Sequence, residues 1–533
     1  MAVTESQSVV SPRQAYNDKL HGDAQDVLTD AKRSAEFQTA EDEAKEQRIA
    51  QMMQDQMSMP MTVNEIQVNG ARNIRRGFLD PVFRPLLHDG PDPPSTVGEV
   101  LSRLQEASAR LSGLQILREP PQVYLSQSQQ ADPSTSPTDV DISLGLKELP
   151  RFKLQSGTDV GNGEGSAYGS LLWRNMFGGA EMLTLNAKAG TRTRSAYSAN
   201  ISAPVFSNPD YRVSLEALSS AVDKPWASHE EVVQGASAKF SWMSRQRDTH
   251  SVEYSGAWRQ VTGLAANASP TIRGDAGDSV KSAIRHTFLR ERRDNPQLPQ
   301  SGYMLKTALE VAGIGPLGGD VAFSKSELEL GGALPIPLPG IPGPTGMSIG
   351  AGLRAGMLWP LPLGYDLCGR ALPSRLNDRF ILGGPTDVRG FGHGGLGPRD
   401  GHDAAGGDVF AAGSVNVLLP FPYKGPDSAL RLQLFANGGR LIALKNSGAR
   451  EREAAAAAAA PGGAGMGPAA VRRAMFDAVG DLVNSPPSLA VGAGLVYAHP
   501  VARFELNFSL PMIIRGGEVG TKGLQLGVGI NLL

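Results

Sequence analysis

The sequence predicts an all-β membrane protein, in which a 16-stranded antiparallel transmembrane β-barrel follows one small α+β domain. Two observations favour this class. From residue 151 to residue 533, apolar and polar residues alternate in many short segments, as in strands with one apolar and one polar face. Glycine is frequent, at 63 residues, and aromatic residues make up only 6%, a balance typical of strands and turns.

Composition argues against several other classes. The formal net charge of -2 provides no general attraction to nucleic acid, so we expect no nucleic-acid partner. The single cysteine, Cys368, can form no disulfide within the chain. The segment MAVTESQSVV has neither the apolar core of a secretory signal nor the arginine-rich composition of a presequence, so we expect neither signal.

The first 60 residues are acidic and rich in glutamine and methionine. Residues 23–57 have a helix-like composition, and we interpret 1–60 as an acidic arm, partly helical or disordered. A solvated helix without a partner fits the same residues equally well.

A compact domain is predicted for residues 61–150. Its final strand has the clearest pattern, because apolar residues from Val140 to Leu146 alternate with polar or small ones. The predicted order is β-α-α-β-β, a small sheet covered by two helices. The five elements are expected near 63–68, 75–87, 96–111, 122–126 and 140–146.

The barrel is predicted for residues 151–533, and its strand number is even, as an antiparallel barrel with both ends on one side requires. In the strand near 502–512, for example, Phe504, Leu506 and Phe508 alternate with polar residues. The sixteen strands are expected near 151–161, 163–177, 180–190, 194–205, 209–221, 230–245, 248–264, 280–291, 301–312, 318–331, 345–359, 407–420, 429–440, 487–498, 502–512 and 522–532.

The connections between these strands favour a membrane barrel over a soluble β-sandwich, which alternation alone cannot distinguish. The two longest, 360–406 and 442–486, both follow odd-numbered strands and therefore open at the same rim. Most connections at the other rim are short, the proline-rich segment near 332–344 being the exception. Within 442–486 a short helix is expected near 469–483.

Three motifs that could carry chemistry lack the context it requires. The G-x-S-x-G pattern at 346–350 continues as a strand instead of forming a strand-to-helix elbow. Glycine-rich segments at 161–165 and 383–397 lack the Gly-Lys-Ser/Thr ending of a phosphate-binding loop. A third group has spacings that match no standard metal site: Cys368, His393, Asp400, His402 and Asp403. We therefore expect no enzyme, no cofactor and no metal.

One constellation remains, in the middle of the 360–406 loop. The segment LGGPTDVRGF contains a glycine-flanked arginine beside an aromatic residue: Gly383, Gly384, Asp387, Val388, Arg389, Gly390 and Phe391. Exposed to water, Arg389 would need no partner. Inside a barrel lumen it would need one, because an unpaired buried charge is unfavourable. Glu505, on the polar face of its predicted strand, is the first candidate.

This loop resembles the signature loop of the insertase superfamily typified by bacterial BamA. Residues 293–302 resemble that superfamily's turn before an upward strand, and residues 406–420 resemble its strand after the signature loop. The unit at 61–150 resembles a single POTRA domain. With one such unit and no secretory signal, the chain resembles the core barrel subunit of the mitochondrial sorting and assembly machinery.

The resemblance implies an integral protein of the mitochondrial outer membrane, with the POTRA domain in the intermembrane space. It implies an insertase that folds β-barrel precursor proteins into the membrane through a lateral gate between the first and last strands. The other implied partners are membrane lipid and the peripheral and barrel subunits of the sorting and assembly machinery. One alternative remains open: a protein-translocating or passive pore with a sealed seam. A membrane-bound enzyme would need a convergent set of histidine, aspartate and nucleophile, and the sequence shows none.

The last strand, QLGVGINL, matches the superfamily's β-signal. Weakly joined edge strands expose backbone groups that an incoming strand can pair with, although the glycines could merely ease barrel curvature. The expected gate residues are Arg151, Leu154, Gly157, Gln525, Gly527, Gly529, Ile530 and Leu532.

One departure concerns the arginine. Bacterial members of the superfamily that this chain resembles often carry carboxylates on the two strands after the signature loop, and the matching positions here are asparagines. The candidate lumen partners of Arg389 are therefore Glu505, Asn416 and Asn437.

Overall fold

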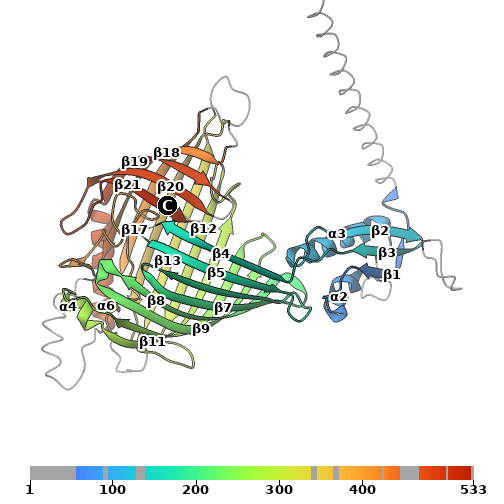
Figure 1. Ribbon diagram of the computed structural model, residues 1–533, viewed down its shortest axis with the longest axis horizontal. Helices are drawn as coiled ribbons and strands as arrows, with labels where there is room; N and C mark the ends of the chain where they lie inside the picture. The colour runs from blue at the N-terminus through green and yellow to red at the C-terminus, as the bar shows by residue number, and fades with distance from the viewer. Residues whose placement is uncertain are drawn as a thin grey trace, which may run out of the picture. The chain divides into compact units, whose positions relative to one another are not determined.

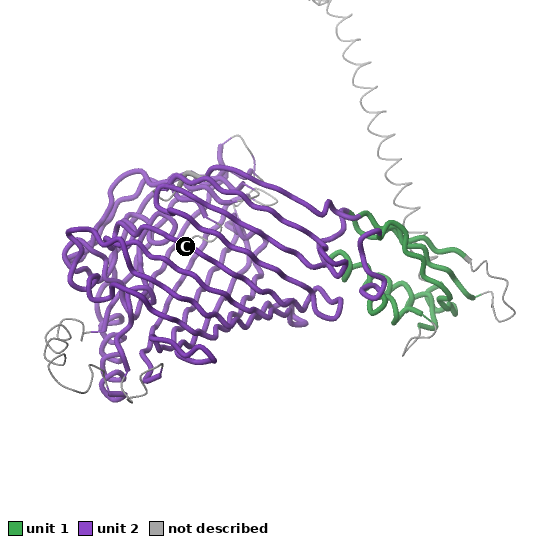
Figure 2. Tube along the Cα trace, turned by 60° about the horizontal axis from the view of Figure 1, so that its bottom comes forward, with its two compact units in different colours: residues 1–71, 80–112, 119–147 green, residues 72–79, 113–118, 148–533 purple. Residues whose placement is uncertain are grey.

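The computed structural model describes residues 56–87, 94–127, 138–161, 164–337, 345–363, 371–422, 425, 428–444, 467–499 and 502–529. The predicted arm up to residue 55, the cysteine Cys368 and the expected gate residues Ile530 and Leu532 lie outside the described residues. The chain divides into two compact units, 1–71 with 80–112 and 119–147, and 72–79 with 113–118 and 148–533 (Figure 2).

The N-terminal elements follow the predicted β-α-α-β-β order. They are β1 (Thr62–Asn69), α2 (Arg76–Phe83), α3 (Val97–Gly113), β2 (Gln122–Gln127) and β3 (Asp139–Gly145), with a short 3₁₀ helix, η1 (Arg84–Leu86), after α2. The sheet order is β1-β3-β2, with β1 parallel and β2 antiparallel to β3. One face of α3 is buried, formed by Val100, Leu104, Ala107 and Leu111. Leu101, which the spacing with Leu104 and Leu111 places on this face, is only half-buried.

The larger unit contains one sixteen-stranded antiparallel sheet in which each strand pairs with the next along the chain (Figure 1). This confirms the predicted fold class and strand number. The strands are β4 (Phe152–Gly161), β5 (Glu164–Arg174), β6 (Met182–Gly190), β7 (Thr193–Val205), β8 (Asn208–Lys224), β9 (His229–Met243), β10 (Thr249–Thr262), β11 (Gly277–Glu291), β12 (Gly302–Ala312), β13 (Phe323–Pro335), β14 (Ser348–Pro360), β17 (Val409–Pro420), β18 (Leu430–Ile442), β19 (Ser488–Ala498), β20 (Arg503–Ile513) and β21 (Gly523–Gly529).

One predicted strand, near 318–331, begins later than expected, at Phe323. The reason is local: Gly318 and Gly319 have φ angles of +60° and +136°, which strand residues do not adopt. Residues 313–322 therefore form a loop.

The polar faces of the strands point inward and the apolar faces outward. In β20, Glu505, Asn507 and Ser509 are buried, whereas Phe504 and Phe508 are 39% and 45% exposed. In β14, β17 and β18 the exposed apolar side chains again share one face, that of Leu353, Val415 and Leu434. This is the reverse of a water-soluble barrel and suits a wall that contacts lipid.

The longer connections lie at one rim, as predicted. The connections 361–408 and 443–487 open at the same rim as the smaller loops that contain η2 (Pro225–Ala227) and α4 (Pro270–Gly274). The 443–487 connection contains α6 (Pro468–Asn484), close to the helix expected near 469–483, and the 361–408 connection contains the short pair β15 (Arg399–Asp400) and β16 (Asp403–Ala404). The connections 336–347, 292–301 and 421–429 are the longer ones at the opposite rim, and the others there, such as 206–207 and 244–248, are short.

The sheet closes on itself at β4 and β21, whose Cα atoms approach within 8 Å. Among the described residues these two strands are the ends of the sheet, and no strand pairing joins them. β21 pairs with β20 over seven positions, from Gly523 opposite Ser509 to Gly529 opposite Arg503. In the part of the chain that the structure describes, no helix is long and apolar enough to cross a bilayer.

Candidate functional site

The tip of the signature loop lies inside the barrel, where Arg389 meets Glu505 on β20. The Nε atom of Arg389 donates to Oε2 of Glu505 at 2.9 Å, and Nη2 donates to Oε1 at 3.2 Å. Both side chains are fully buried. The two parallel hydrogen bonds fix the position and the orientation of the planar guanidinium.

Glu505 is a shared acceptor. Besides Arg389, it accepts from Nη2 of Arg503 at 2.6 Å and from Nδ2 of Asn507 at 2.8 Å. The guanidinium carbon of Arg389 also lies 5.0 Å from the centre of the Phe435 ring, within cation–π range. The carboxylate therefore holds a cation from the loop and a cation from its own strand.

The two asparagine candidates occupy different positions. The carboxamide of Asn437, oriented to satisfy its neighbours, donates to the backbone oxygens of Arg389 and Ala490 at 3.2 Å and accepts from the backbone N–H of Arg389 at 2.6 Å. Asn437 thus holds the backbone of the arginine, while Glu505 holds its guanidinium. Asn416 lies on β17 beside Gly350 of β14, where a Cβ atom would overlap its amide.

The loop's glycines have backbone conformations that other residues rarely adopt. Gly383, Gly384 and Gly390 have φ angles of +107°, +134° and +85°. A Cβ at Gly390 would lie 2.6 Å from the Cβ of Ala490, and one at Gly383 would lie 2.7 Å from the carbonyl oxygen of Gly392. The close approach of the loop to β19 therefore requires glycine at position 390.

Asp387 and two apolar side chains complete the loop. One oxygen of Asp387 accepts from Arg354 of β14 at 2.6 Å, and the other accepts from the backbone N–H of Gly383 at 2.9 Å. Val388 and Phe391 are fully buried in an apolar cluster that contains residues of the loop and of the inner strand faces: Leu358, Phe380, Leu382, Leu396, Phe410, Ala412, Leu441 and Ala490.

The loop also holds the last strand from inside. The backbone N–H of Gly390 donates to Oε1 of Gln525 at 2.8 Å, and Nε2 of Gln525 lies 3.4 Å from the carbonyl oxygen of Phe391. A Cβ at Gly527 would lie 3.1 Å from the carbonyl oxygen of Pro385, so the loop backbone passes directly over this glycine. The inner face of β21 is thus a docking surface for the loop.

The expected gate residues of the first strand make fewer contacts. Leu154 is 77% exposed, on the outward face. Arg151 precedes β4 and donates to the backbone oxygens of residues 175 and 176 at 3.1 and 3.0 Å. Gly157 leaves room for Tyr168 on β5, whose Oη would be 2.8 Å from a Cβ at that position. Of the two strands at the seam, β21 makes the contacts with the loop that are described above, and β4 makes none of them.

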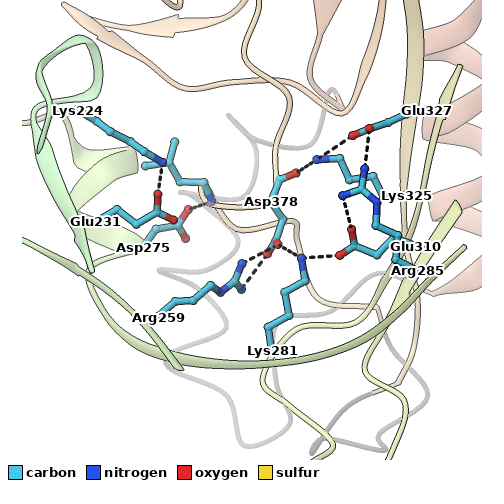
Figure 3. A network of polar contacts seen from close by, with 11 residues as sticks. Lys224, Glu231, Arg259, Asp275, Lys281, Arg285, Glu310, Lys325, Glu327 and Asp378 are labelled. Carbon is cyan, nitrogen blue, oxygen red and sulfur yellow. Dashed lines mark hydrogen bonds and ion pairs between the residues drawn. The ribbon is translucent and has the colours of Figure 1, made fainter. Parts of the chain in front are cut away.

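A second anchor, at the base of the loop, was missed by the sequence analysis. Asp378 is buried and accepts from Arg259 of β10 at 2.7 and 3.1 Å, and Nζ of Lys281 lies 3.4 Å away (Figure 3). Lys325 donates to its backbone oxygen at 3.0 Å. Burial alone would raise the pKa of Asp378, but the charges of Arg259 and Lys281 hold this pKa below its ordinary value.

The carboxylates that share the loop with His393 and His402 are also used as anchors. Asp403 accepts from the hydroxyl of Ser228 at 2.5 Å and from the backbone N–H of Ser269 at 2.7 Å. Asp400 accepts from the hydroxyl of Thr271 at 2.8 Å. Among the described residues no cluster of three or more potential metal ligands is present.

Comparisons with known proteins identify the family of the chain. Residues 175–532 match the Omp85 superfamily domain. A SAM50-like protein of Schizosaccharomyces pombe is 33% identical over 492 residues, covering 91% of this chain and 94% of its own. The sorting and assembly machinery component 50 homolog of Mus musculus is 31% identical over 440 residues, covering 82% of this chain and 84% of its own.

Among solved structures, BamA from Haemophilus ducreyi lacking POTRA domains 1–3 superimposes with a TM-score of 0.65. It is 13% identical and covers 88% of this chain and 84% of its own, so it shows a shared fold. The fold and the lumenal loop define an outer-membrane barrel of the Omp85 type. The chain belongs to the sorting and assembly machinery component 50 (SAM50) family of the Omp85 superfamily.

Proposed function

We propose that this chain is the barrel subunit that folds β-barrel precursor proteins into the mitochondrial outer membrane, through a lateral gate between β4 and β21. The protein is an integral protein of that membrane. The names of its relatives support a role in a sorting and assembly machinery. One observation supports the gate. The sixteen strands form one closed sheet, but among the described residues the two edge strands, β4 and β21, do not pair with each other.

An edge of this kind is reactive towards another strand. Its backbone donors and acceptors are satisfied when an incoming strand adds to it. In lipid the same groups would remain unpaired at considerable free-energy cost, so strand addition is strongly favoured there. Pairing and apolar burial supply the free energy, and the mechanism needs neither catalytic residues nor a cofactor.

The loop gives the two edges different roles. Gln525 and Gly527 bind the β21 edge to the loop from the lumen, whereas β4 is exposed along its length from Phe152 to Ser156. We propose that β21 is the fixed edge and β4 the edge that moves. The N-terminal α+β unit would be a POTRA domain in the intermembrane space, where it would contact precursors or partner subunits.

Site-directed crosslinking during import of a labelled precursor tests the gate. In a C368S background, single cysteines at the outward positions Leu524, Leu526 and Val528 of β21 should form adducts with the precursor's last strand. The matched control is Leu434→Cys on β18, which is equally outward-facing but in the middle of the sheet, and should form none. Adducts should disappear when the precursor's β-signal is mutated.

Locking the seam with a disulfide distinguishes the gate hypothesis from the hypothesis of a pore with a sealed seam. Leu154→Cys is combined with Leu526→Cys or Val528→Cys in the C368S background, and the pair that crosslinks on oxidation is used, because a reductant reopens a disulfide in the same sample. The gate requires that insertion stop in the oxidised protein and resume after reduction. Full insertion through the oxidised seam, with no adducts on β21, would instead establish a pore with a sealed seam.

A further inference from the structure

Helix α6, in the 443–487 connection, packs against the outer wall of the barrel. Its buried face contains Val471, Met475 and Ala478, which join an apolar cluster with residues of three strands: Met357 and Trp359 of β14, Val409 of β17 and Ile442 of β18. These strand residues share a face with Leu353, Val415 and Leu434, the exposed outward side chains described above. The helix therefore covers the lipid side of the wall, and it lies at the same end of the barrel as α4 (Figure 1).

A half-buried cation fixes the helix at that level. Arg440 of β18 is on the same outward face as Leu434 and Ile442, where an arginine in contact with lipid is unfavourable. Its guanidinium donates to the backbone oxygens of Asp481 and Ser485, at the C-terminal end of α6. The helix thereby supplies the acceptors that a lipid tail cannot, and it does so at the end of the helix where the dipole favours a cation.

A second apolar stripe on α6 is exposed. Phe476, Val479 and Val483 are 68%, 37% and 76% exposed. Their spacing of three and four residues places them on one line along the helix, beside the buried face. Arg472, one turn before Phe476, and Arg473 are exposed as well. The helix thus has one apolar face on the barrel, another apolar line beside it, and basic side chains at its first turns.

We propose that α6 lies in the lipid interface of the outer membrane, with Phe476, Val479 and Val483 inserted among the acyl chains and Arg472 and Arg473 binding anionic headgroups. The occupant is inferred to be lipid because the surface on which α6 packs is the continuation of the barrel's lipid-facing wall. An apolar stripe flanked by arginines is the arrangement of interfacial helices. The helix would anchor this rim at a fixed depth in the bilayer.

The test uses the full-length protein in a C368S background, purified alone and reconstituted into vesicles. An environment-sensitive fluorophore is attached to single cysteines at positions 476, 479 and 483. Asp477→Cys, on the opposite flank of α6, is the water-exposed control, and Leu353→Cys on β14 is the lipid-exposed control. The three stripe positions should match position 353 in their blue-shifted emission and in protection from a water-soluble quencher.

The proposed binding of Arg472 and Arg473 to anionic headgroups is tested by varying the lipid composition of the vesicles. Protection at position 476 should increase when phosphatidylglycerol is added to phosphatidylcholine vesicles, and the R472E/R473E variant should lose that increase while keeping the position-353 signal. Stripe positions that are quenched as readily as position 477 in both vesicle types would overturn the proposal. Protection that appears only after other subunits are added would also overturn it, by identifying a protein-docking face.

Discussion

Arg389 and Glu505 are 116 residues apart in the sequence and form a fully buried pair with two hydrogen bonds, inside a barrel whose wall contacts lipid. Removing either partner leaves the other charge buried, which typically costs about 3–5 kcal/mol. We expect Glu505→Gln to be the more damaging single change, because it leaves both Arg389 and Arg503 without the carboxylate. Denaturant unfolding of the reconstituted barrel, followed by tryptophan fluorescence, measures the loss.

A double-mutant cycle measures the interaction energy between Arg389 and Glu505 apart from their contacts with other residues. The R389M/E505M variant should lose less stability than the sum of the two single variants, because neither charge of the pair remains. Strictly additive losses would mean that the two residues act independently.

Asn437 should stabilise the folded barrel through its hydrogen bonds with the backbone of Arg389. Asn437→Ala removes the partners of two backbone groups in the buried loop, each worth about 1–3 kcal/mol when left unsatisfied. Asn416→Ala is the matched control on the neighbouring strand and should cost less. Equal losses from the two variants, measured by the same unfolding assay, would contradict this assignment.

Gly390 should tolerate no side chain. Gly390→Ala combines a φ of +85° with a Cβ only 2.6 Å from that of Ala490. Gly401, in the same loop, has a φ of +60° and open space around it, so Gly401→Ala isolates the conformational strain. Gly390→Ala should be destabilising by about 1–3 kcal/mol more than Gly401→Ala, and adding Ala490→Gly should recover part of that difference.

Gln525 should couple the loop to the last strand. Gln525→Leu keeps the size of the side chain but removes the acceptor of the Gly390 N–H, so the backbone of residues 523–529 should exchange hydrogen faster. Hydrogen exchange measured by mass spectrometry on the full-length protein reports this, with β18 as the internal reference. Unchanged exchange in β21 would show that the loop does not hold it.

The base of the loop should be sensitive to acid. Because the pKa of folded Asp378 is below its ordinary value of 3.8, its contribution is present above that value and is lost as the pH falls through the folded pKa. Asp378→Asn should therefore weaken the loop at neutral pH, and the difference from wild type should shrink below about pH 4. Hydrogen exchange of residues 376–408 measures this, with the exposed Asp477→Asn as control.

The sequence predicted the sheet well because strand alternation is a local property. Glu505 could be selected because the polar residues of 503–509 share one face, and that face must point into a wet lumen. The pairing of Asp378 with Arg259, 119 residues away, could not be predicted, because nothing local distinguishes that aspartate from others in the loop. The backbone role of Asn437 depends in the same way on where the loop finally lies.

The outward position of α6 also could not be predicted from the sequence. Its apolar spacing predicts a helix but not which surface the helix covers, and only the register of β14, β17 and β18 identifies that surface as the outer wall.

The buried arginine also sets an order of events during the protein's own maturation. Nearly all pairings in the sheet join neighbouring strands and can form as soon as each strand is available. Arg389 differs, because its carboxylate belongs to the penultimate strand. Until residue 505 has been synthesised and placed, the guanidinium is more stable in water than in the lumen. We therefore expect the loop to enter the lumen only after β20 is in place, and a barrel truncated before residue 505 to keep Arg389 in solvent.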